Sequence, residues 1–177
     1  MNGGNLFGIV LLVKNQQWYD VLMKAAHPDI IVVSPSGEYL LLVEVKLGDG
    51  PELHQTAIEQ LQYLMTLMGC SVGLAVTGPR ISLLHDSLEQ PNGESIHIVR
   101  EAQLPSYLLP SLNEQPANRF GFEFENRIQQ WLDNLQKTAN LDNLSADLQD
   151  LLADSVMPLL QFGEIRAAGP RWSKVAS

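Results

Sequence analysis

Two short clusters of charged residues lie close together in this 177-residue chain, and each borders an apolar run. His27-Pro28-Asp29 precedes the apolar run 30–33, and Glu44-Val45-Lys46 follows the apolar run 40–43. A charged group at the end of a buried strand is costly unless it is paired or bound to a cation. These clusters are therefore the first candidates for chemistry in the sequence.

The two apolar runs and the segment between them predict a β-hairpin. Segment 34–38 reads Ser-Pro-Ser-Gly-Glu, which is typical of a turn. With Ser36-Gly37 at the centre of the turn, the expected opposed pairs are Val33 with Leu40, Ile31 with Leu42 and Asp29 with Glu44. Opposed side chains share a face of the sheet, with Cβ atoms roughly 4.5–5.5 Å apart. One end of the hairpin should therefore collect two carboxylates and the ammonium group of Lys46.

Two opposed carboxylates repel one another unless a cation lies between them. Oxygen ligands suit a hard ion such as Mg²⁺, which commonly takes one or two protein carboxylates and keeps several waters. The pattern therefore predicts a site for Mg²⁺ or Mn²⁺ on Asp29 and Glu44. Lys46 would lie close to the attacking water or to a phosphate oxygen.

At these residues the chain resembles the PD-(D/E)XK nuclease superfamily, which has the restriction-endonuclease-like fold. Pro28-Asp29 matches the PD half of the motif, and Glu44-Val45-Lys46 matches the ExK half. The expected order of elements also matches: the hairpin, a helix near 52–68, and strands near 72–77 and 81–85. Segments 57–63 and 73–77 look like the nuclease domain of type I restriction enzymes. The resemblance covers roughly residues 14–100.

The resemblance implies a metal-dependent nuclease that hydrolyses DNA phosphodiester bonds. Asp29 and Glu44 would bind the metal with help from the main-chain carbonyl of Val45. Lys46 would orient or help to deprotonate the attacking water and would stabilise charge on the phosphate. Many relatives also carry a Glu on a helix before the hairpin. The helix expected at 16–26 has none, and Asp20 is its only acid.

Two further side chains are candidates for lining the cleft. Gln60 lies on the helix near 52–68, where relatives place a polar residue that contacts the cleft or the substrate backbone. In those relatives a Gln and a Tyr are four positions apart, whereas Gln60 and Tyr63 are three apart. The alternative for Gln60 is a solvent-facing position on the flank of the helix. His27 is expected to border the same cleft.

The charge balance favours a second interpretation. The chain has 11 Lys and Arg residues against 20 Asp and Glu, a formal net charge of −9. Because nucleic-acid affinity rests largely on cations that neutralise phosphates, a strong autonomous DNA binder should be more basic. The alternative is an inactive nuclease-fold protein that acts as a regulatory or protein-interaction module. A third possibility is a nuclease that depends on a protein partner to bind DNA.

The remaining pattern predicts an α/β protein in two parts. Residues 1–112 should form a restriction-endonuclease-like core with a mixed central sheet flanked by helices. Residues 113–177 should form a helical extension packed on or beside the core, with helices from about 120 and from about 145 to 161. This acidic extension is either a solvated surface or an element for docking a partner or a second copy. The tail from Gly163 is expected to be a frayed end.

Several function classes lack support in the sequence. The single Cys70 excludes an intramolecular disulfide and a cysteine-based zinc site, and it suits the reducing cytoplasm. No apolar run approaches the ~20 residues of a membrane helix. Histidines 27, 54, 85 and 97 lack the spacing of a metal motif such as HExxH. Phosphate-binding loops and serine-hydrolase motifs are also missing.

Overall fold

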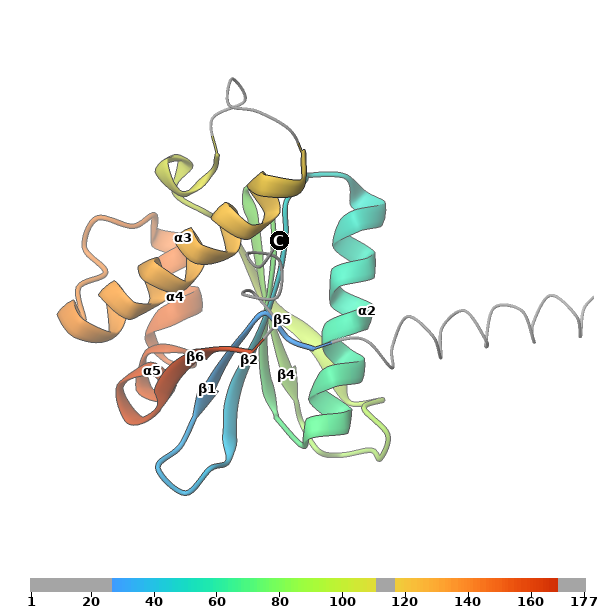
Figure 1. Ribbon diagram of the computed structural model, residues 1–177. Coiled ribbons are helices and arrows are strands. Elements are labelled where there is room, and N and C mark those ends of the chain that lie inside the picture. Colours follow the sequence, from blue (N-terminus) through green and yellow to red (C-terminus); the bar gives the residue numbers. More distant parts are fainter. Residues whose placement is uncertain (1–26, 111–116, 169–177) are drawn as a thin grey trace, which may run out of the picture.

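The computed structural model describes residues 27–110 and 117–168, with side chains at 27–110 and 121–168. Its centre is a six-stranded mixed sheet in the order β5-β4-β3-β2-β1-β6 (Figure 1). The strands are β1 (Ile30–Val33), β2 (Tyr39–Lys46), β3 (Val72–Thr77), β4 (Arg80–Asp86), β5 (Ile96–Gln103) and β6 (Glu164–Ala167). The helices are α2 (Pro51–Met68), the 3₁₀ turn η1 (Ser106–Leu108), α3 (Ala117–Thr138), α4 (Ala146–Ala153) and α5 (Met157–Phe162).

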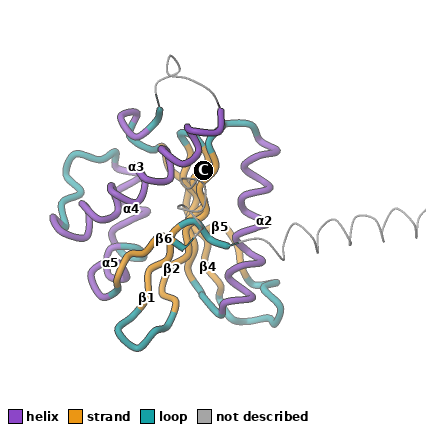
Figure 2. The backbone as a smooth tube through the Cα atoms, viewed as in Figure 1, coloured by secondary structure: helices purple, strands orange, loops and turns teal. Residues whose placement is uncertain are grey.

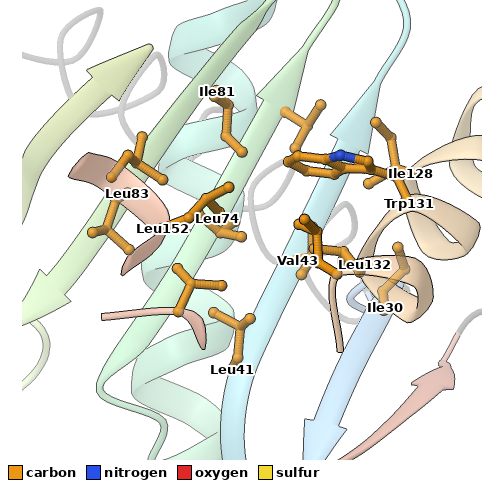
Figure 3. Packing of buried hydrophobic residues seen from close by; sticks show 14 of the residues in the cluster. Ile30, Leu41, Val43, Leu74, Ile81, Leu83, Ile128, Trp131, Leu132 and Leu152 are labelled. Carbon is orange, nitrogen blue, oxygen red and sulfur yellow. The ribbon is translucent and has the colours of Figure 1, made fainter. Parts of the chain in front are cut away.

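Helices cover both faces of the sheet (Figure 2). Helix α2 buries Ala57, Leu61 and Leu64 against one face, as its apolar stripe predicts. Helices α3, α4 and α5 lie on the other face and contribute to a larger cluster. Figure 3 shows Ile128, Trp131 and Leu132 of α3 beside strand residues of that cluster. The prediction of an α/β protein with a mixed sheet between helices is therefore confirmed.

The register of the hairpin agrees with the sequence prediction over most of its length. Ile30 pairs with Val43, Ile31 with Leu42 and Val32 with Leu41. Val33 pairs with Tyr39 instead of the expected Leu40, because a bulge follows Val32. The bulge lies next to the turn, so the predicted register is intact at the charged end.

The helix α2 carries the chain from β2 to β3 and makes these strands parallel. It begins at Pro51, whose fixed φ suits the first helical turn, and it ends at Gly69 in the left-handed conformation at φ 65°. Where α2 packs on β3, a Cβ added to Gly73 would lie only 2.6 Å from Sδ of Met65. Gly73 therefore lets α2 approach β3 closely.

Two predictions for the C-terminal part were wrong in detail. The single helix expected at 145–161 is divided into α4 and α5, and Pro158 lies in the first turn of α5, where proline is tolerated. Residues 164–167, expected to fray, form β6 and pair antiparallel with β1. The helix expected at 16–26, with Asp20, lies outside the described residues. No helix of the described part is both long and apolar enough to cross a membrane.

Candidate active site

The hairpin positions Asp29 beside Glu44, as its register predicts. Asp29 immediately precedes β1, and its backbone N–H donates to the carbonyl of Val43 at 3.0 Å. On the other side, the Asp29 carbonyl accepts a hydrogen bond from Ala168 N at 3.0 Å, just beyond β6. The Asp29 carboxylate accepts a further bond, 2.7 Å long, from the backbone N–H of Val45. Asp29 is therefore held by both neighbouring strands.

Glu44 is a buried carboxylate with an unusual environment. Glu44 is 0% exposed to solvent, and the Lys46 ammonium lies 2.5 Å from Oε1 of Glu44. Apart from this ion pair, neither Glu44 oxygen has a polar partner among the described residues. Burial raises the pKa of Glu44 from 4.5 to about 7, and the nearby charge of Asp29 adds to the rise while Lys46 opposes it.

Lys46 ends β2 with its side chain 32% exposed. Burial alone would lower the pKa of its ammonium, but the negative charges of Glu44, Asp29 and Glu125 raise it overall. The raised pKa keeps the Lys46 side chain protonated and positively charged. It is suited to stabilising negative charge on a substrate rather than to removing a proton.

Glu125 is a fourth charged residue at this site, and the sequence analysis did not identify it. It lies on α3, where Phe124 and Ile128 are fully buried in the core. Its charge acts on both Glu44 and Lys46, raising the pKa of each. In the sequence, Glu125 is simply a polar residue beside the apolar stripe. Only the packing of α3 relates it to the hairpin.

A glycine fixes the segment that follows Lys46. The backbone N–H of Gly78, in the turn between β3 and β4, donates to the Lys46 carbonyl at 3.1 Å. Gly78 has φ 55°, and a Cβ there would lie 2.5 Å from the Gly48 carbonyl oxygen. Because only glycine fits both demands, this turn can lie directly against the end of β2.

The other two predicted residues are the side chains expected to line the cleft. His27 is exposed and two residues before Asp29, while Gln60 is half-buried on the flank of α2. Within residues 27–110 and 121–168, no three His, Cys, Asp or Glu side chains converge as ligands of one metal ion. The donors that do converge, Asp29 and Glu44, fit an ion that takes two carboxylates and keeps its waters.

A second polar cluster lies on the same face of the sheet, under the start of α2. His54 Nδ1 is 2.7 Å from the Thr77 hydroxyl, and its Nε2 is 3.2 Å from the Ser82 hydroxyl and 3.3 Å from Glu101. Ser82 also donates to Glu101 at 2.8 Å. Ser82 is fully buried and its hydroxyl donates directly to a carboxylate, so this cluster is not a serine-hydrolase triad.

The cluster is next to the candidate site. Lys46 pairs with Thr77, and Glu44 pairs with Ala75, which in turn pairs with Ser82. This cluster is hard to predict from the sequence, because Thr77 and Ser82 lie within or beside apolar runs and His54 precedes the apolar stripe of α2.

Comparison with known proteins adds no relative. No family model, no curated protein and no solved structure matches this chain. Any assignment of function therefore rests on the chemistry of Asp29, Glu44 and Lys46 and on the elements that hold them.

Proposed function

We propose that this protein is a metal-dependent nuclease that hydrolyses DNA phosphodiester bonds on a restriction-endonuclease-like core. The observation that carries the proposal is the Glu44 carboxylate, buried beside Asp29 with the Lys46 ammonium as the one polar partner of its oxygens among the described residues. A buried carboxylate in this state costs free energy that a cation bound between the two acids would offset. Such a cost is commonly found at functional sites.

Each residue has a role that follows from its surroundings. Asp29 and Glu44 would hold Mg²⁺ or Mn²⁺, together with the main-chain carbonyl of Val45. The bound ion would supply Lewis acidity and lower the pKa of a water. The Val45 N–H fixes the orientation of the Asp29 carboxylate. Lys46, held in its cationic form, would stabilise charge on the phosphate, and Glu125 adds negative potential that attracts a cation.

The order of elements supports the same proposal. The hairpin β1–β2, the helix α2 and the parallel strand β3 follow one another as the resemblance implies. In many relatives an acidic helix precedes the hairpin. In this chain α3, which follows the hairpin in sequence, brings Glu125 into electrostatic contact with Glu44.

A cleavage assay tests the proposal. Asp29→Asn and Lys46→Met keep the approximate shapes of the side chains and remove their charges. Each should lower Mg²⁺- or Mn²⁺-dependent cleavage of DNA by about a hundredfold or more, the loss typical of removing one electrostatic contact to a transition state. Asp49→Asn, which alters an exposed acid in the next loop, is the matched control. Unchanged activity in both site variants, or an equal loss in the control, would exclude this assignment.

One observation favours a second candidate, a catalytically silent module that binds a protein partner in the cytoplasm. The Lys46 ammonium already lies 2.5 Å from Glu44 and neutralises part of its charge. With a net charge of −9, the chain is also better suited to a basic partner than to free DNA, and the C-terminal helices would provide the docking surface. Calorimetry separates the candidates: heat of Mg²⁺ binding that Asp29→Asn removes supports the nuclease, whereas no binding at millimolar Mg²⁺ supports the silent module.

A further inference from the structure

Two histidines face each other across the strands β4 and β5. His85 pairs directly with His97 in the antiparallel register, and both residues are exposed. Directly opposed residues of an antiparallel pair share a face, with Cβ atoms about 4.5–5.5 Å apart. The pair does not form a short sequence motif, because the loop between β4 and β5 separates the two residues in the chain.

A hydrogen bond determines which ring nitrogen of His97 carries the hydrogen in the neutral form. His97 Nδ1 lies 2.9 Å from the carbonyl oxygen of Ser95. A carbonyl can only accept, so Nδ1 must carry the hydrogen and donate it. In the neutral ring Nε2 then holds the free lone pair. Metal-binding histidines are oriented in the same way, by donating their other ring N–H to a carbonyl or carboxylate.

The strand ends that carry the pair are tied together. The Asp86 carboxylate accepts hydrogen bonds from the Ser95 hydroxyl and, at 2.9 Å, from the backbone N–H of Leu88. Asp86 follows His85, and Ser95 is the residue that anchors the His97 ring. The strand ends beneath both histidines are therefore joined, and the ring of His97 is fixed, which reduces the ordering cost of binding a ligand between them.

The local charge favours a cation. Asp86 ends β4 and the loop after it supplies Glu89 and Glu94, whereas the nearest cation on β5 is Arg100, which pairs with Leu83. The Asp86 carboxylate interacts electrostatically with both imidazole rings. A divalent ion at the pair would therefore meet attraction rather than repulsion.

We propose that His85 and His97 bind a divalent transition-metal ion of the class that prefers imidazole, such as Zn²⁺, Ni²⁺ or Cu²⁺. Two ring nitrogens would coordinate the ion and water would complete its shell, because no third ligand converges within the described residues. This site differs from the carboxylate site in position and in ligand type. His85 pairs with Val72 at the start of β3, whereas Lys46 pairs with Thr77 at its end.

Titration of the full chain with Ni²⁺ and Zn²⁺ tests the proposal. Millimolar Mg²⁺ is included to satisfy the carboxylate site, and binding is followed by calorimetry and by the histidine ring resonances in NMR. The wild-type chain should bind one equivalent, with the resonances of both rings shifted. His85→Gln and His97→Gln should each weaken binding by about tenfold or more, equivalent to at least about 1.4 kcal/mol. His27→Gln, at another exposed histidine, should leave binding unchanged.

Three results would overturn the proposal: no saturable binding to the wild type, undiminished binding in both pair variants, or an equal loss in His27→Gln. Circular dichroism checks that each variant is folded, as expected for exposed positions. The outcome is independent of the nuclease assignment, because Asp29→Asn should keep full Ni²⁺ and Zn²⁺ binding while it abolishes Mg²⁺-dependent cleavage.

Discussion

Two polar clusters lie side by side on the α2 face of the sheet, and they differ in how their hydrogen bonds are satisfied. At the hairpin end, Glu44 is buried with only the Lys46 ammonium against its oxygens, within the described residues. Under α2, His54 uses both ring nitrogens, and its partners Thr77 and Ser82 are bonded in turn. Each cluster combines a buried polar residue, Glu44 or Ser82, with a more exposed one, Lys46 or Glu101, so burial alone does not distinguish them.

This is the difference expected between a polar group that stabilises the fold and one that can bind a ligand. A fully bonded network fixes the position of α2 on the sheet and leaves little capacity for a ligand. A buried carboxylate with a single polar partner keeps that capacity and destabilises the fold in return. The part of the chain that the structure describes offers both kinds side by side, so variants of the two should respond in different ways.

The largest effect is expected from breaking the satisfied cluster. His54→Leu should lower the free energy of unfolding by about 3 kcal/mol, since it removes the hydrogen bonds of both ring nitrogens and takes away the partner of the buried Thr77 hydroxyl. Urea unfolding measures this change as a lower midpoint with an unchanged slope. Gln55→Leu, at an exposed neighbour on the same helix, is the control and should change stability by less than about 0.5 kcal/mol. Equal effects in the two variants would mean that the network does not stabilise the fold.

The titration of Glu44 should make the free energy of unfolding depend on pH. In the folded chain the pKa of Glu44 is raised to about 7, whereas its unfolded value is 4.5. Between these values the folded state keeps a proton that the unfolded state releases. Stability should therefore fall as pH rises through this window, by about 3 kcal/mol, and should level off above it.

The isostere Glu44→Gln isolates this contribution, because it cannot titrate. The difference in unfolding free energy between wild type and Glu44→Gln, measured by urea denaturation from pH 4 to pH 8, should shrink or reverse as pH rises. A difference that is constant across the series would contradict the raised pKa.

The smallest effect is expected from Glu125, which acts at longer range. Glu125→Gln should lower the pKa of Glu44 and reduce Mg²⁺ binding a fewfold, while it changes stability by less than about 0.5 kcal/mol. NMR titration of the Glu44 carboxyl measures the pKa directly. Glu123→Gln removes an exposed acid from the same helix. If it has the same effect, Glu125 has no special relation to the site.

The sequence predicted the parts of the site that depend on local rules. The turn at Ser36-Gly37 and the alternation of side chains were enough to place Asp29 beside Glu44. The contribution of Glu125 could not be predicted in this way, because it depends on how α3 crosses the sheet. The pairing of His85 with His97 depends on a register shift in the β4–β5 pair, between Leu83 and Leu84.

The fold was predictable to a similar degree. Strand β3 and the helix α2 have long, clear patterns, and their boundaries agree with the structure to within one or two residues. Strand β6 is four residues long and mostly exposed, with Glu164 and Arg166 on it. Its sequence is like that of an ordinary chain end. The strand forms because the rest of the fold brings it beside β1, and the sequence of β6 does not encode that pairing.

The pairing of β6 with β1 has a consequence for the order of folding. The backbone of Asp29 is fixed by Val43 on one side and by Ala168 on the other, so the first and last described segments must meet before this residue is in place. Contacts so distant in sequence form slowly, because the entropy of closing a long loop must be overcome first. On a ribosome, the hairpin would be synthesised early, but its charged end would be completed only after β6 had emerged. The chain would therefore acquire its site as one of the last steps of folding.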